Sequence, residues 1–443
     1  MTMRAASRLL NSCFSVLFIL CPIAPRALAQ TSGAPTGDRD ADLQFVVMLS
    51  RHGVRSPLTS QAELDKFSAA PWPKWDVPPG IQTAHGNELI RIFGAWDRTH
   101  WSGEGLFAHS GCADASRVTI VADVDQRTRE TGKALAEGIF PGCGIEVKSQ
   151  PDGTVDPLFH ALNSGLFHPD TALAAAAVEG RIGGDPKNPL ETYHPQLAAL
   201  DRVLTGCGKL PPNPTRTSIF DIPTTLAPGS GGSMISARSP LATASTFAEN
   251  LLLEYTQGMS DADTGWGCLD GATLRYLMQL DTAAWDYSAR TPLIARTNAS
   301  NLLDHIEKTL EQGASGKPVA GAIGKPDDKL VILVGHDSNI APVAGALRID
   351  WVLDGRVDDT PPGGQLLFEL WRPRDGGAPF VRVEYTAQTL EQMRQAQPLT
   401  PANPPGIAPV FVPGCSGPDL SCPWDKFSEV MHQAIDPAFV QRP

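Results

Sequence analysis

The sequence LQFVVMLS occupies residues 43–50 and runs directly into RHGVR at residues 51–55. Its apolar residues alternate little with polar ones, which is typical of a strand buried on both faces of a parallel sheet. Two further apolar runs end in charged residues: VTIVA at 118–122 precedes DVDQR, and LVILVG at 330–335 precedes HDSN. Because parallel strands present their carboxyl ends at one rim of the sheet, we expect these three charged segments to converge.

The wider pattern predicts an α/β fold, with a mostly parallel central sheet flanked by helices and a mainly helical inserted cap domain. Helical spacing at residues 128–138 follows an apolar run, as in βα units. Residues 243–254 form a good helical pattern, 364–370 are strand-like, and the Pro-rich residues 398–413 are expected to be an ordered surface loop. We divide the chain into a signal peptide (1–29), a disordered leader (30–40), the first part of the α/β domain (41–167), the helical cap (168–290) and the second part of the α/β domain (291–443).

The N-terminus has the features of an export signal. Arg4 and Arg8 precede an apolar run at residues 14–23, and ALA at residues 27–29 supplies the small residues that a signal peptidase requires. We expect cleavage after Ala29 and a periplasmic or secreted protein; an ordinary N-terminal helix is the alternative. No later stretch reaches the roughly 20 apolar residues of a membrane span, so we expect no membrane association after cleavage.

Six cysteines follow the expected cleavage point, and an even number in an oxidising compartment suggests disulfides. Cys415–Cys422 and Cys112–Cys143 are the favoured pairs, which leaves Cys207 with Cys268. Free buried thiols are the alternative. No C-x-x-C spacing occurs, which argues against a zinc site. We expect neither a metal nor a cofactor.

The chain is acidic, with 48 Asp and Glu against 36 Lys and Arg and a formal net charge of −12. Residues 1–29 carry three Arg and no acidic residue, so their loss changes this charge to −15. Such a charge argues against a nucleic-acid partner. It does not oppose a small phosphorylated substrate, because a local pocket can carry the opposite sign. The chain has neither a P-loop nor a G-x-S-x-G motif.

The segment after the first strand combines two guanidinium groups with an imidazole. Arg51 and Arg55 each present paired donors that match phosphate oxygens, so together they can cradle the anion. A phosphate held there would lie against His52, whose neutral imidazole is a competent nucleophile. Nearby Arg charges lower the pKa of a histidine and favour this neutral form.

The other two strand ends supply the remaining groups of a phosphoryl-transfer site. Asp337 can protonate the leaving alkoxide, His336 can donate to the phosphate oxygens, and Arg127 adds a third guanidinium. These groups could neutralise the transferring phosphoryl group without a metal. We expect Asp123 and Asp125 to be structural, capping or pairing with Arg. The other histidines have no metal-ligand spacing and are expected to be surface or core residues: His85, His100, His109, His160, His168, His194, His305 and His432.

RHGVRSP at residues 51–57 and GHD at 335–337 resemble the two signatures of the histidine acid phosphatase family, and the chain is similar to its bacterial phytase and glucose-1-phosphatase branch. Further matches are WPKW (72–75), ADVDQRT (122–128), DPLF (156–159), QGM (257–259) and TPPGG (360–364). The resemblance implies a histidine phosphatase-like fold and a monomer. It implies these roles: His52 as nucleophile, Asp337 as proton donor, Arg51, Arg55, Arg127 and His336 as phosphate-binding residues, and Glu249 as an acidic residue near the substrate.

Substrate choice depends on the residues after the signature proline. Phytases of this branch have Thr-Lys there, and the Lys helps to hold the polyphosphate; this chain has Leu58 and Thr59. Leu58 and Ser338-Asn339 resemble glucose-1-phosphatase, whereas Gly53-Val54 and residues 123–129 resemble phytase. We expect hydrolysis of phytate (myo-inositol hexakisphosphate) and other phosphate monoesters. A glucose-1-phosphatase of narrow specificity is the alternative, and a catalytically silent periplasmic phosphate-ester-binding protein is an alternative of another class.

Overall fold

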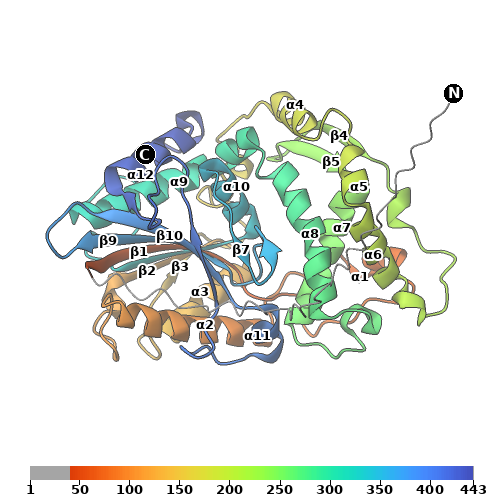
Figure 1. Ribbon diagram of the computed structural model, residues 1–443, viewed down its shortest axis with the longest axis horizontal. Coiled ribbons are helices and arrows are strands. Elements are labelled where there is room, and N and C mark those ends of the chain that lie inside the picture. The colour runs from red at the N-terminus through yellow and green to blue at the C-terminus, as the bar shows by residue number, and fades with distance from the viewer. Residues whose placement is uncertain (1–39, 443) are drawn as a thin grey trace, which may run out of the picture. The chain divides into compact units, whose positions relative to one another are not determined.

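A mixed sheet forms the centre of the computed structural model, which describes residues 40–442 (Figure 1). The strand order is β11-β10-β9-β1-β6-β2-β3, and β12 pairs with β10. The parallel half contains β1 (Ala41–Arg51), β6 (Leu330–Gly335), β2 (Val118–Ala122) and β3 (Val147–Lys148). The antiparallel half contains β9 (Gln365–Pro373), β10 (Phe380–Ala387), β11 (Gly406–Val410) and β12 (Cys422–Pro423).

The register of the parallel strands brings the three charged segments to one level. Arg51 at the end of β1 pairs with Gly335 at the end of β6, and the last residue of β2 pairs with Val334. The ladder continues one residue further, because His52 N donates to Gly335 O at 3.0 Å and Asp123 N donates to Val334 O at 3.0 Å. The predicted convergence of the three segments is confirmed.

Helices cover both faces of this sheet (Figure 1). Val46 and Met48 of β1 pack in the core with residues of α2 (Ala84–Gly103) and α3 (Gln126–Ile139). Val47 and Leu49 point to the opposite face, where the helices are α9 (Pro292–Ser315), α10 (Asp337–Leu347) and α12 (Trp424–Ala434). The strand therefore buries both of its faces, as its uninterrupted apolar sequence predicts. The predicted fold class is confirmed.

Between α3 and α9 the chain forms a mainly helical region that also contains a hairpin. Its core gathers leucines of α6 to α8, including Leu200, Leu251 and Leu277. The helix predicted at residues 243–254 lies within α7. The elements are α4 (Thr171–Arg181), α5 (Asn188–Thr192), α6 (His194–Leu204), β4 (Thr225–Pro228), β5 (Ile235–Arg238), α7 (Pro240–Thr256) and α8 (Gly271–Ser288). The division of the chain at residues 168 and 291 remains a prediction, since the described residues belong to one compact unit.

The prediction of a surface loop at residues 398–413 is wrong in part. Residues Gly406–Val410 form β11, which pairs antiparallel with β10. The strand lies at the edge of the sheet, where Pro409 is tolerated because one side of the strand needs no ladder hydrogen bonds. The smaller elements are α1 (Gln61–Leu64), β7 (Val352–Leu353), β8 (Arg356–Val357) and α11 (Leu390–Gln395).

Three disulfides form as predicted: Cys112–Cys143, Cys207–Cys268 and Cys415–Cys422, with Cα atoms 5.5, 6.1 and 5.2 Å apart. Such pairs are typical of proteins outside the reducing cytoplasm. Within residues 40–442, no helix combines the length and the apolar character that a membrane span needs. The predicted signal peptide and all but the last residue of the predicted leader lie outside the described residues.

Candidate active site

The guanidinium groups of Arg51 and Arg55 meet at the rim of the sheet. Both donate through Nη2 to the same oxygen, Oε1 of Glu249 on α7, at 2.5 and 2.9 Å. Nη2 of Arg51 also lies 2.7 Å from Oδ2 of Asp337, and its Nη1 donates to Thr360 O at 2.5 Å. Both arginines are buried. Two planar cations are thus held together by carboxylate oxygens, an arrangement that also suits the oxygens of a phosphate.

His52 is held in a single tautomer. Its Nδ1 donates to the carbonyl of Gly53 at 2.9 Å, so the lone pair of the ring is at Nε2. Burial, followed by the charges of Arg55 and Arg51, lowers the pKa of His52 well below its ordinary value. The imidazole is therefore neutral in mildly acidic solution, which is the form that can attack phosphorus.

Asp337 is the first residue of α10, and only His336 separates it from the end of β6. Burial raises the pKa of its carboxyl group, but the charges of Arg51, His336 and Arg55 outweigh burial and hold that pKa below its usual range. The backbone before it is fixed, because His336 N donates to Oδ1 of Asn339 at 2.9 Å. A Cβ at Gly335 would lie 2.4 Å from the same oxygen, so a larger residue there would force the Asn339 side chain to move.

His336 and His160 share one buried carboxylate. Nε2 of each ring lies 2.7 Å from Oδ2 of Asp123. The ring centroids of His52 and His336 are 5.5 Å apart, so His336 borders His52. Arg127 enters from α3 and pairs through Nη2 with Oδ2 of Asp125 at 2.6 Å. The predicted structural role of Asp125 as an Arg partner agrees with this contact.

The surroundings of Asp123 and His160 differ from those that the sequence predicts. Asp123 was expected to cap a helix or pair with Arg, but its side chain binds two imidazoles. His160 was expected to be a surface or core residue, yet it reaches the strand ends. Its contact with Asp123 spans 37 positions of sequence, and no local spacing signals it. The segment DPLF at 156–159, which precedes His160, is the one indication that this loop lies near the site.

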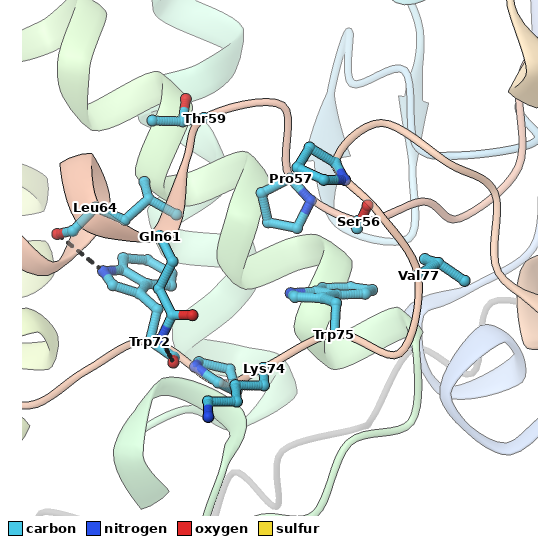
Figure 2. Close-up of a pocket in the computed structure, with 11 residues that line it drawn as sticks. Ser56, Pro57, Thr59, Gln61, Leu64, Trp72, Lys74, Trp75 and Val77 are labelled. Atoms are coloured by element: carbon cyan, nitrogen blue, oxygen red, sulfur yellow. Dashed lines mark hydrogen bonds between the residues drawn. The ribbon is translucent and has the colours of Figure 1, made fainter.

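The side chains of Leu58 and Thr59 lie in different surroundings. A Cβ at Gly80 would lie 2.9 Å from Cδ2 of Leu58 and 3.7 Å from Nη1 of Arg127, so Leu58 flanks the Arg127 guanidinium. The Leu58 side chain is 58% exposed. Thr59 instead lines a cavity of about 290 Å³ that contains Trp72 and Trp75 (Figure 2). The wall of that cavity is fixed by Gln61, whose Nε2 donates to Trp72 O at 2.9 Å.

Of the predicted residues, the structure brings together Arg51, His52, Arg55, His336, Asp337 and Glu249, with Arg127 and Leu58 at their border. The model of the histidine phosphatase superfamily (branch 2) matches residues 42–386, which include all of these groups. The chain belongs to this superfamily. The match confirms the predicted family and, with it, the prediction of a histidine acid phosphatase.

The relatives of this phosphatase include both types of enzyme that its sequence resembles. It is 35% identical to phytase AppA of Escherichia coli over 435 residues, which cover 95% of this chain and 98% of that protein. It is 29% identical to glucose-1-phosphatase of Salmonella typhimurium over 417 residues, covering 92% and 96% of the two chains. Among solved structures, Hafnia alvei phytase in complex with tartrate superimposes with a TM-score of 0.84 at 34% identity, covering 92% of this chain and 100% of that one.

Proposed function

We propose that this phosphatase hydrolyses phosphate monoesters in two steps, with His52 as the nucleophile. Nε2 attacks phosphorus, the bond to the ester oxygen breaks, and a phosphohistidine forms; water then attacks the phosphohistidine and releases phosphate. The observation that supports this most strongly is the combination at His52: Nδ1 bound to Gly53 O, a depressed pKa, and guanidinium groups on adjacent residues. Neutral imidazole and preorganised cations are what covalent phosphoryl transfer requires.

Phosphate binding must displace acceptors that occupy the cations in the ligand-free site. Glu249 holds both guanidinium groups, and Asp337 holds one of them. A phosphate group offers more acceptor oxygens than either carboxylate, so it can contact several of these donors at once. We therefore assign phosphate binding to Arg51, Arg55, Arg127 and His336, with Glu249 as the group that the phosphate replaces.

Asp337 acts as the proton donor to the leaving group. Its depressed pKa means that the free carboxyl group is ionised over most of the acidic range. A monoester that binds as the monoanion carries the missing proton, since its second pKa is near 6. When the phosphate binds Arg51, this cation no longer lowers the pKa of Asp337 to the same extent. Asp337 can then accept the proton of the monoester and pass it to the ester oxygen.

Phytate is the substrate that the overall similarity favours. The relatives named phytase match nearly the whole chain, and the Hafnia alvei enzyme has also been solved with myo-inositol hexakis sulphate, superimposing with a TM-score of 0.83. We propose that the enzyme acts on phytate and other phosphate monoesters as a periplasmic or secreted monomer without a metal cofactor.

One cavity favours a second candidate, a sugar phosphate. A cavity of about 250 Å³ lies beside Ser338, the residue next to the proposed proton donor. Its lining includes Trp285, Asn163 and Asn298, and none of its described lining residues is Lys or Arg. Such a surface suits an uncharged, hydroxylated leaving group better than a ring with further phosphates. Exposed Leu58 in place of a polar residue points the same way.

The experiment that tests this function compares phosphate release from phytate, glucose 1-phosphate and an aryl phosphate in EDTA at about pH 5, where the proposed donor and nucleophile are both competent. Turnover in EDTA that His52→Ala abolishes supports the mechanism, and the ranking of kcat/KM values identifies the substrate class. Absence of turnover with every ester, together with retained phosphate-ester binding, would instead support a silent binding protein.

A further inference from the structure

The cluster of Asp123, His160 and His336 has more ligand capacity than the phosphatase reaction uses. Oδ2 of Asp123, Nε2 of His160 and Nε2 of His336 all lie within 4.8 Å of one another. Only His336 of these has a part in the proposed phosphate binding. Two imidazole nitrogens and one carboxylate oxygen make a donor set that suits Zn²⁺.

We propose that Asp123, His160 and His336 form a binding site for Zn²⁺, and that the bound ion inhibits the enzyme. The site is inferred in addition to the phosphatase reaction, for which we propose a mechanism without a metal. The proposal that the ion binds depends only on the three clustered residues. The proposal that it inhibits also depends on the proposed function, in which His336 binds phosphate.

An unsatisfied oxygen provides a second and independent indication of a ligand. Asp123 is fully buried, and its Oδ1 has no hydrogen-bond partner among residues 40–442. A buried carboxylate oxygen without a partner is costly, and a bound cation removes that cost. The charge also fits, because Asp125 adds a second carboxylate whose Oδ2 lies 3.5 Å from Nε2 of His336.

The geometry requires only a small rearrangement. Zinc ligands lie about 2.1 Å from the ion, so tetrahedral neighbours are about 3.4 Å apart. The two N–O separations at Asp123 are 2.7 Å and would open by less than an ångström. His160 can supply this movement, because its side chain is 31% exposed and it precedes a short 3₁₀ turn. Each imidazole presents its lone pair to the ion, and the proton now shared with Asp123 moves to Nδ1 or to solvent.

The residues around the cluster indicate how Zn²⁺ could reach it and why the bound ion would inhibit the enzyme. His160 lines the cavity of about 250 Å³ beside Ser338, so an ion can approach from that side. Coordination would remove the Nε2 proton of His336, so this nitrogen could no longer donate to phosphate. A metal that recruits Asp125 would also break its 2.6 Å contact with Arg127. Both effects weaken the proposed phosphate site.

The test uses the purified chain without a histidine tag, stripped with EDTA and exchanged into chelator-free buffer. Zn²⁺ affinity is measured by competition with a chromophoric chelator for wild type, His160→Asn and His109→Asn. His109 is an exposed histidine outside the cluster and provides the matched control. We expect one tight Zn²⁺ per chain, about tenfold or greater loss of affinity in His160→Asn, and no change in His109→Asn.

Inhibition is measured with an aryl phosphate, each variant against its own rate in EDTA, and circular dichroism confirms folding. The Zn²⁺ concentration that halves the rate should rise in His160→Asn in parallel with the loss of affinity. Unchanged Zn²⁺ affinity in a folded His160→Asn variant, or no stoichiometric binding by wild type, would overturn the site. Tight binding that depends on His160 but leaves the rate unaffected supports the site and counts against the phosphate role of His336.

Discussion

Nη2 of Arg51 lies 2.7 Å from Oδ2 of Asp337. One contact thus joins the residue proposed to hold the phosphate to the residue proposed to protonate the leaving group. In the ligand-free site this contact keeps Asp337 ionised, and substrate binding competes for the same guanidinium. Binding of the phosphate and protonation of Asp337 are therefore coupled through Arg51.

This coupling predicts an acidic pH optimum. Above about pH 6 the ester loses its second proton, so kcat/KM should fall by up to tenfold per pH unit. On the acid side, burial and the neighbouring arginines hold the pKa of His52 well below its ordinary value, so the nucleophile stays neutral far into the acid range. A pH–rate profile with an alkyl phosphate measures both limbs. An optimum above neutral pH contradicts these roles.

Asp337→Asn should affect esters according to their leaving groups. The amide cannot donate a proton, so kcat for an alkyl phosphate should fall by about 10²- to 10⁴-fold. The loss should be much smaller for p-nitrophenyl phosphate, whose leaving group is stable as an anion. Steady-state kinetics on the two esters provide the comparison. Equal losses with both esters would remove Asp337 from the role of acid.

Glu249→Gln should strengthen product inhibition. Glu249 occupies the guanidinium groups of Arg51 and Arg55, and a neutral amide competes less well with phosphate for them. We expect the inhibition constant of inorganic phosphate to fall by about fivefold, with Glu63→Gln, an exposed site on α1, as the control. An unchanged or weaker phosphate affinity would mean that Glu249 organises the arginines rather than competing for them.

The residues after the signature proline predict a shift in specificity. Replacing Leu58→Thr and Thr59→Lys together gives the chain the Thr-Lys pair that phytases of this branch have after the signature proline. The ratio of kcat/KM for phytate to that for glucose 1-phosphate should rise by about tenfold, since one further charge contact is worth about 1.4 kcal/mol. Leu166→Thr, at another exposed leucine, serves as the control. A ratio that stays constant would place the specificity elsewhere.

Buried carboxyl groups predict greater stability in acid. Burial raises the pKa of Asp97 to about 8, and that of Glu254 to about 8. The folded state therefore holds a proton that the unfolded chain releases near pH 4, so this stabilisation is complete below about pH 4 and declines as pH rises toward 8. Each group contributes at most about 1.4 kcal/mol per pH unit.

Thermal unfolding between pH 5 and 8 checks this, because the window lies between the unfolded pKa of about 3.9 and the folded pKa of about 8. Asp97→Asn keeps a neutral group of the same shape, so its Tm should fall less over this window than that of wild type. Exposed Asp76→Asn should match wild type. A variant with the full wild-type decline would show that Asp97 is ionised in the folded protein.

The sheet and the rim could be predicted because each strand carries its own signal. Residues 43–50, 118–122 and 330–335 are apolar runs with few polar residues, and all three lie in strands of the parallel half. The charged residues that follow them converge because the three strands are paired in parallel and end at the same level of the sheet. Cysteine pairing could be predicted from number and spacing.

The missed features depend on tertiary contacts. β11 has Pro in its sequence and becomes a strand only because β10 offers it an edge. His160 carries no local signal, and its position beside His336 depends on where the loop after residue 156 crosses the strand ends. Glu249 could be assigned only from the family resemblance, because a solvated position and a site position of a helix look alike in sequence. The packing of α7 brings it to the two arginines.

The most direct test of the phosphohistidine mechanism is rapid acid-free quenching of the enzyme during turnover of an excess of aryl phosphate, followed by mass spectrometry of the peptide that contains residue 52. We predict one phosphoryl group on His52 that forms within the first turnover, disappears when the substrate is exhausted, and is absent from His52→Ala. A wild-type enzyme that turns over at full rate with no phosphoryl group on His52 would contradict the mechanism and favour direct attack by water.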